Sequence, residues 1–228
     1  MRIARGKWLF MPSFYNLGDY STQAQHRVDD KPYGGGAGAL IQVEPVYNCI
    51  HTIESKKQEE CPKGIPSTQS KKMEYKNNSV FPPWERGNQR GIRKIYLSPR
   101  WERLRQPKID ELSKSLHNEE FIILCGHYEW VDERVFEIFE FEHYSIGDFV
   151  VSSGELATMV FLDALVRLIP GVVGNKDSLH EESFSEALDG KPEYPQYTRP
   201  ADFMGYKVPE ILLCGDPKKI NAWRKKSI

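Results

Sequence analysis

The chain has 228 residues, of which 39% are hydrophobic and 28% charged, and its formal net charge at pH 7 is −1. This length allows one large domain or two small ones, and the apolar fraction is high enough to form a packed core. The balanced charge excludes binding to nucleic acid through overall charge, so contact with RNA would need a local basic face such as 90–105 or 218–226.

The first region, residues 1–53, begins with apolar, strand-like residues: Trp8, Leu9, Phe10, Phe14 and Tyr15. It then enters a glycine-rich loop, YGGGAG at 33–38. Consecutive glycines let the backbone approach a ligand or another segment closely. No Lys-Ser/Thr pair follows the loop and no strand–loop–helix unit surrounds it, so it is neither a P-loop nor a dinucleotide-binding fingerprint. It is either a tight structural loop or a ligand loop.

Residues 54–92 differ sharply in composition from their surroundings. They are rich in Lys, Gln, Glu, Ser, Asn and Pro and have little hydrophobic periodicity. Such a stretch cannot bury enough apolar surface to offset the entropy lost on ordering. We therefore interpret it as a flexible insertion.

Three short apolar runs predict strands at 92–98, 121–125 and 147–152. Between the first two, residues 107–116 have the pattern of an amphipathic helix with proline in its first turn. Strands that alternate with helices indicate an α/β fold with a largely parallel sheet.

A long helix is predicted at 155–169. Ser152 and Glu155 have the spacing of a capping box, and Pro170 followed by Gly171 would end the helix. Because nearly every position is apolar, we expect this helix to be buried on most sides.

Arg167 is a cation on this apolar helix. It follows Asp163 by four residues, so the two side chains would share one face of the helix. Arg167 forms either a structural salt bridge or a contact with a substrate oxygen, and the spacing alone does not separate the two.

Two loops have a possible role in binding. Residues 126–135 (GHYEWVDERV) directly follow a predicted strand, which is where open α/β proteins bind ligands. Residues 145–156 (SIGDFVVSSGEL) offer backbone groups that can hold an adenine edge, and free N–H groups at the start of a helix. The alternatives are a solvated turn with local ion pairs for the first loop and an ordinary strand-to-helix turn for the second.

Residues 178–228 are polar, with scattered aromatic side chains, and predict a small second domain. Within HEESFSEALDG (180–190), Glu181 and Glu182 are candidate proton acceptors, although an acidic loop can equally be only solvated. The four cysteines form no CxxC pair and no zinc spacing with histidine, which indicates reduced thiols in a cytosolic protein and no metal site.

Taken in order, the blocks between Val28 and Trp223 resemble the bacterial-type tRNA (guanine-N1-)-methyltransferase (TrmD) family of the SPOUT class. The resemblance implies an α/β sheet with a C-terminal deep trefoil knot, a rare exception among protein folds. It divides the chain into a cofactor-binding domain at 1–173 and a small helical, tRNA-binding domain at 174–228. From the resemblance we also expect the family's N-terminal strand and helix to be missing from this chain.

The same resemblance implies an activity. The family forms cytoplasmic homodimers that use S-adenosyl-L-methionine to methylate guanine N1 in tRNA, at the position just 3′ of the anticodon. The family requires Mg²⁺, but the residues here offer no ligand cluster for it.

The resemblance also assigns roles to residues. Arg167 would hydrogen-bond to the guanine carbonyl oxygen and favour the negative charge that develops there, while Glu182 would accept the N1 proton as general base. Three segments would bind the methyl donor, and their residues are Tyr96, Leu97, Ser98 and Pro99; Gly126, Tyr128 and Glu129; and Ser145, Ile146, Gly147, Asp148, Phe149, Val150, Val151 and Gly154.

The sequence departs from the family pattern at these segments. Glu182 stands where the family has aspartate, and Trp101 and Trp130 stand where it has glycine. His127 replaces an arginine and Ser153 a glycine. A catalytically impaired member with residual RNA binding is therefore the alternative function. A third hypothesis is an unrelated nucleotide-binding module built on the glycine-rich loop.

Overall fold

The structure, a computed structural model, describes residues 10–59, 91–116, 118–173 and 182–227. The chain divides into two compact units, Met1–Val172 and Val173–Ile228. Among the described residues, no helix is both long enough and apolar enough to cross a membrane.

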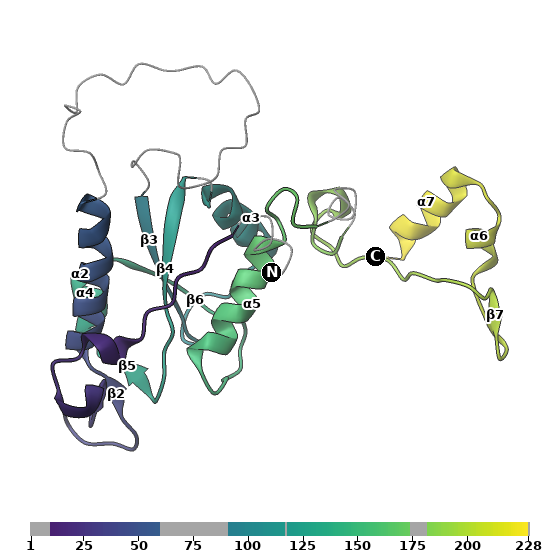
Figure 1. Cartoon of the computed structure of the whole chain (residues 1–228). Helices are drawn as coiled ribbons and strands as arrows, with labels where there is room; N and C mark the ends of the chain where they lie inside the picture. The colour runs from purple at the N-terminus through teal and green to yellow at the C-terminus, as the bar shows by residue number, and fades with distance from the viewer. Residues whose placement is uncertain (1–9, 60–90, 117, 174–181, 228) are drawn as a thin grey trace, which may run out of the picture. The chain divides into compact units, whose positions relative to one another are not determined.

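The centre of the first unit is a three-stranded parallel sheet in the order β4-β3-β6 (Figure 1). It consists of β3 (Gly91–Leu97), β4 (Glu119–Leu124) and β6 (Phe141–Tyr144). The strands predicted at 92–98 and 121–125 are confirmed within two residues. The strand predicted at 147–152 is wrong, because that segment is irregular and the third strand lies just before it.

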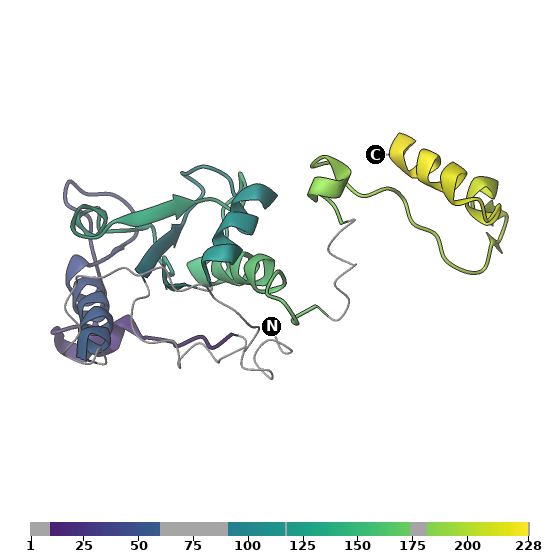
Figure 2. The same cartoon turned by 90° about the horizontal axis from the view of Figure 1, so that it is seen from above.

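Helices cover both faces of this sheet, as Figures 1 and 2 show. On one face lie α2 (Val43–Glu59) and α4 (Arg134–Ile138), and on the other lie α3 (Gln106–Ser115) and α5 (Gly154–Val166). Alternation along β3 divides the core accordingly. Tyr96 packs with α2 and α4, whereas its neighbours Ile95 and Leu97 pack with α3 and α5.

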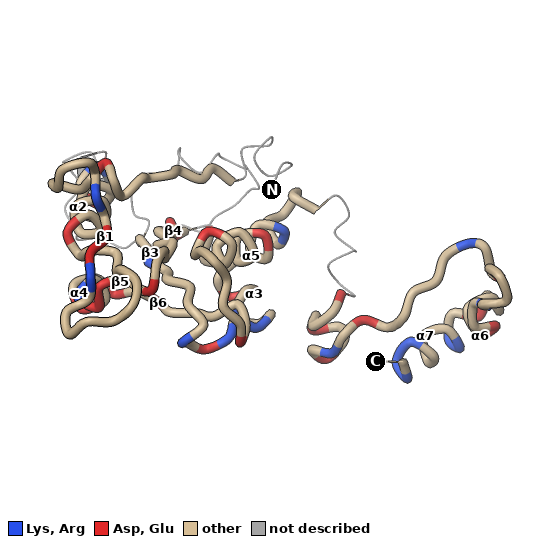
Figure 3. The backbone as a smooth tube through the Cα atoms, turned by 90° about the horizontal axis from the view of Figure 1, so that it is seen from below, with Lys and Arg blue, Asp and Glu red and all other residues tan. Residues whose placement is uncertain are grey.

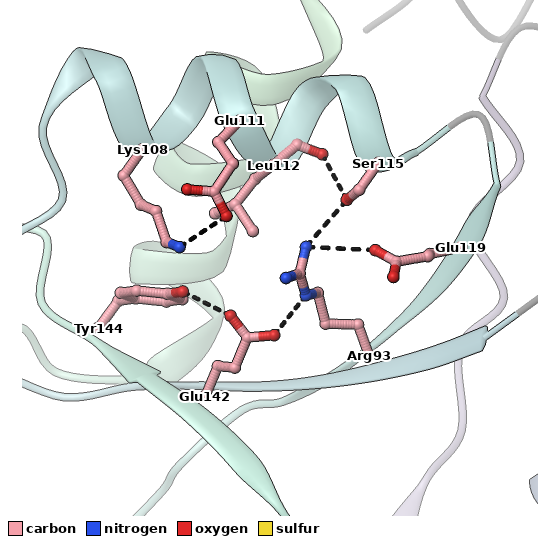
Figure 4. Close-up of polar contacts among 8 residues, drawn as sticks. All are labelled: Arg93, Lys108, Glu111, Leu112, Ser115, Glu119, Glu142 and Tyr144. Atoms are coloured by element: carbon pink, nitrogen blue, oxygen red, sulfur yellow. Dashed lines mark hydrogen bonds and ion pairs between the residues drawn. The ribbon is translucent and has the colours of Figure 1, made fainter.

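The predicted helix at 107–116 is confirmed as α3, which has proline in its first turn. A polar network joins this helix to the sheet (Figure 4). Arg93 on β3 forms ion pairs with Glu119 of β4 and Glu142 of β6, and its Nη1 donates to the hydroxyl of Ser115 at 3.0 Å. One arginine therefore links all three strands to α3.

The long helix predicted at 155–169 is confirmed as α5, but it ends three residues early at Val166. Two further expectations for it are wrong. Ser153, not Ser152, is the N-cap, and its side chain makes no capping hydrogen bond. The helix is also not buried on most sides, since Leu156, Met159 and Val160 are exposed and Met159 keeps 60% of its surface accessible.

The bounds predicted for the flexible insertion, 54 and 92, are both wrong. The helix α2 continues through Glu59, and β3 begins at Gly91. Glu54 is held to the sheet by an ion pair of 2.7 Å with Lys94. The rest of the predicted insertion, 60–90, lies outside the described residues.

A second small sheet has the order β1-β2-β5. Its strands are β1 (Asp29–Asp30), β2 (Leu40–Ile41) and β5 (Trp130–Val131), with β2 parallel to β5. Two 3₁₀ turns precede it, η1 (Leu17–Tyr20) and η2 (Ala24–His26). The strand-like character expected near the N-terminus is not realised at 10–16, which is irregular, and residues 1–9 lie outside the described residues.

The second unit contains η5 (Glu186–Leu188), the hairpin β7 (Asp202–Phe203) and β8 (Tyr206–Lys207), α6 (Glu210–Leu213) and α7 (Pro217–Lys226). The Asp216 carboxylate caps α7 by accepting from the amides of Lys218 and Lys219. Arg224 lies 4.7 Å from the ring centre of Tyr194, which joins α7 to the segment before the hairpin.

Candidate functional site

The carboxyl ends of β3, β4 and β6 meet at one edge of the sheet, because the three strands are parallel and adjacent. This edge is where open α/β sheets bind ligands. The three segments expected to hold the methyl donor begin here, at residues 96–99, 126–129 and 145–151. The structure therefore brings together segments that are spread over residues 96–151 of the sequence.

The first segment continues from the buried end of β3. Tyr96, Leu97 and Ser98 are all buried, with 3% of Tyr96 accessible, and Pro99 is exposed. The amide of Ser98 donates to the carbonyl oxygen of Tyr144 at 2.9 Å, so the loop after β3 is fixed to the end of β6.

The second segment owes its position to two glycines in close contact. The amide of Gly154, at the start of α5, donates to the carbonyl oxygen of Gly126 at 2.8 Å. A Cβ added at Gly154 would lie 2.4 Å from the Gly126 nitrogen, and one added at Gly126 would lie 2.8 Å from the Tyr96 hydroxyl. Side chains at either position would force the segments apart.

Tyr128 and Glu129 complete this segment. Tyr128 is exposed and has a positive φ of 62°, an uncommon conformation for a residue with a side chain. Glu129 contacts the glycine-rich loop, because a Cβ added at Gly38 would lie 2.3 Å from the Glu129 Cγ. At Gly38 the absence of a side chain therefore allows the glycine-rich loop to pack closely against Glu129, which is a structural role.

The third segment turns away from β6 without forming a strand. The buried Ser145 hydroxyl donates to the carbonyl oxygen of Gly147 at 2.9 Å, and Arg103 pairs with Asp148 at 3.1 Å. Among the described residues, the backbone groups of Phe149 and Val150 have no hydrogen-bond partner, and 86% of Val150 is accessible. The backbone donors and acceptors at these two residues are therefore available to a ligand.

The start of α5 carries an ion pair beside Gly126. His127 Nε2 lies 2.6 Å from Glu155 Oε1. Desolvation raises the pKa of Glu155, but hydrogen bonds from His127 and from its own backbone outweigh it and hold the pKa below the ordinary value.

The two tryptophans lie beside these segments, against other side chains. The Trp130 ring meets Tyr96 edge-on at 5.9 Å, and its Nε1 donates to Glu133 at 3.0 Å. The Trp101 ring lies 4.5 Å from that of His143. The resemblance marked both tryptophans as departures from the family pattern. Nothing in the sequence predicted that Trp130 contacts Tyr96 and Glu133, or that Trp101 contacts His143.

The two predicted catalytic residues lie in different units. Arg167 is the C-cap of α5 and is half-buried in the first unit, where its amide donates to the carbonyl oxygen of Asp163 at 3.2 Å. Glu182 is half-buried in the second unit, and Glu181 lies outside the described residues. Within the described ranges, no group of three or more His, Cys, Asp or Glu residues could hold a metal ion.

Comparison with known proteins relates nearly the whole chain to one family. The family model described as tRNA (Guanine-1)-methyltransferase TrmD matches residues 1–82 and 84–228. A relative from Carboxydothermus hydrogenoformans, named tRNA (guanine-N(1)-)-methyltransferase, is 41% identical over 99% of this chain and 74% of its own. Relatives of the same name from Oceanobacillus iheyensis and Clostridioides difficile are 38% and 37% identical, over 95% and 99% of this chain and 74% and 82% of theirs.

Proposed function

The chain belongs to the tRNA (guanine-1)-methyltransferase family, and we therefore propose that it methylates N1 of guanine in tRNA, at the position just 3′ of the anticodon. The observation that carries this proposal is the match over nearly all of the chain to relatives bearing that name. The meeting of three loop segments at one edge of a parallel sheet supports it, since this is a ligand-binding arrangement.

We propose S-adenosyl-L-methionine as the methyl donor. The residues fit such a group, because the unpaired backbone at Phe149 and Val150 suits an adenine edge and Gly126 allows close approach of the backbone. The donor, when bound, supplies an electrophilic methyl group on a sulfonium. The protein's own residues would hold it with the segments at 96–99, 126–129 and 145–154.

Two residues of the chain would act on the guanine. Arg167 would donate a hydrogen bond to the carbonyl oxygen, where negative charge grows as N1 loses its proton. Glu182 would accept that proton as general base, with a side chain one methylene longer than the family's aspartate. The remaining work of the protein is to place the reacting atoms in line.

A homodimer and a knot complete the proposal. The exposed apolar side chains of Leu156, Met159 and Val160 on α5 give the chain a face that a second copy would cover.

The knot is supported by the path of the chain, which leaves β6 and returns to the end of β4, where the amide of Gly154 donates a hydrogen bond to the carbonyl oxygen of Gly126.

We assign tRNA binding to the second domain, taken as 174–228. Its α7 carries five cations, marked blue in Figure 3, and cations of this kind bind phosphates. Their positions are Lys218, Lys219, Arg224, Lys225 and Lys226. The proposed setting is the cytoplasm, where the tRNA substrate is found, and a requirement for Mg²⁺ would follow the family.

The test is mass spectrometry of nucleosides from tRNA incubated with the protein and S-adenosyl-L-methionine. We expect 1-methylguanosine from a tRNA with guanine at the position 3′ of the anticodon, and none from the same tRNA with adenine there. Absence of 1-methylguanosine from the first tRNA, with donor binding demonstrated, would overturn the proposal.

A further inference from the structure

We propose that Arg100, Trp101 and Trp130, here called the indole clamp, position the segments that bind the methyl donor. The inference rests on the proposed function, since it concerns the same site. The family pattern has glycine at both tryptophan positions, so the clamp belongs to this chain and not to the general family mechanism.

The clamp joins the loop after β3 to the segment after β4. The Arg100 guanidinium lies 5.2 Å from the ring centre of Trp101 and 5.8 Å from that of Trp130. Both distances are within the range of cation–π attraction. Glu133 reinforces the arrangement, because it accepts from the Trp130 indole at 3.0 Å and lies 3.9 Å from Arg100.

Each indole in turn contacts a side chain of the central sheet. Trp130 meets Tyr96 of β3 edge-on, and Trp101 lies 4.5 Å from His143 of β6. Within the described residues, the buried Nδ1 of His143 has no hydrogen-bond partner, so ring contacts hold this side chain. The clamp therefore touches the ends of β3, β5 and β6 together.

The route from the clamp to the donor segments runs through Tyr96. Its ring is 3% accessible, and its hydroxyl fills the space that a Cβ at Gly126 would need. Gly126 accepts the hydrogen bond from Gly154. A shift of Trp130 would release Tyr96, and with it the spacing between the three segments.

Positioning of the segments and obstruction of the donor site by the indoles predict opposite changes in donor affinity. If the indoles blocked the donor, their replacement by glycine would raise donor affinity. If they position the segments, the same replacement lowers it. The contacts of the indoles favour positioning, because the half-buried Trp130 lies against Tyr96 and Glu133, and Trp101, although 36% accessible, lies against His143.

The experiment is calorimetry of S-adenosyl-L-methionine binding to the full chain and its variants. We expect Arg100→Ala to raise the donor Kd about two- to fivefold, as the loss of exposed cation–π contacts implies. Trp130→Gly should raise it about tenfold, since ring contacts are lost and the backbone gains freedom. Trp130→Phe should keep most of the affinity, because it retains a ring against Tyr96.

Lys108→Ala is the matched control. Lys108 also lies over an aromatic ring, 5.8 Å from the centre of Tyr144, but outside the clamp, and its loss should leave the donor Kd unchanged. Thermal unfolding checks that each variant is folded at the binding temperature. The KM for tRNA should not change in Arg100→Ala, which separates positioning of the donor from a general loss of structure.

A donor Kd in Arg100→Ala and Trp130→Gly that is within twofold of the unmodified chain, or lower, overturns the clamp proposal. An unmodified chain that binds no donor overturns both proposals. Donor binding that weakens as expected in the variants, without 1-methylguanosine from the unmodified chain, overturns the proposed function alone.

Discussion

The amide of Gly154 donates a hydrogen bond of 2.8 Å to the carbonyl oxygen of Gly126, and the Gly126 backbone leaves no room for a side chain at Gly154. This contact joins the start of α5 to the end of β4. The loop that leaves β6 is thereby held against the sheet, at the edge where the segments that we propose to bind the donor meet.

Gly154→Ala should therefore damage both stability and binding. The added methyl would meet the Gly126 nitrogen at 2.4 Å, and we expect a loss of about 1–3 kcal/mol in the free energy of unfolding. Chemical denaturation measures this loss. Gly91→Ala is the control, because a Cβ there would find its nearest neighbour at 3.9 Å. Equal stability of the two variants would contradict the role given to the contact.

Arg93→Ala should destabilise the first unit by about 2 kcal/mol, since it removes charge-assisted hydrogen bonds between the sheet and α3. Its side chain is 22% accessible and pairs with both Glu119 and Glu142. Arg103→Ala is the comparison, because its pair with Asp148 is more than half exposed and should contribute under about 1 kcal/mol. Denaturant midpoints distinguish the two, and a larger loss in Arg103→Ala would contradict this ranking.

The contact between Glu155 and His127 should be detectable as a lowered pKa of the Glu155 carboxyl group. The folded pKa of Glu155 lies below its ordinary value of 4.5, so the pair's stabilisation is present above about pH 4.5 and is lost as pH falls through the lower, folded pKa. Carboxyl NMR should report the lowered pKa, and His127→Ala should raise it. Because the pair is half exposed, its effect on the free energy of unfolding should be small. An unchanged pKa of Glu155 in His127→Ala would contradict the claim that His127 lowers it.

Charge reversal on α7 tests the role of the second unit. Lys225→Glu with Lys226→Glu should raise the KM for tRNA and lessen its dependence on salt, because two phosphate contacts would be lost. The donor Kd should stay constant. Unaltered KM and salt dependence would place tRNA binding elsewhere.

Local patterns predicted much of the first unit. The strands β3 and β4 and the helices α3 and α5 follow from β-branched runs, proline in a first turn and a long apolar stretch. The helix α2 was missed because its buried residues Val46, Cys49 and Ile50 occupy one narrow stripe in a polar sequence. The apolar residues at 149–151 suggested a strand, but no neighbouring strand pairs with them among the described residues.

The site was predicted by resemblance more than by chemistry. Sequence order alone cannot show that Gly154 touches Gly126, or that Arg100 lies between Trp101 and Trp130, because these contacts depend on how the strands pair. Resemblance indicated the three segments that we propose to bind the donor, and it marked both tryptophans as unusual. The contacts of the indoles become visible only in the three-dimensional structure.

Methylation of guanine N1 by this chain is tested most directly by mass spectrometry of tRNA incubated with the unmodified chain, with Arg167→Ala and with Glu182→Gln. We predict 1-methylguanosine at the position 3′ of the anticodon from the unmodified chain, and about a hundredfold or greater loss of kcat in each variant, with little change in the donor Kd. A chain that binds the donor but forms no 1-methylguanosine in that tRNA would contradict the account.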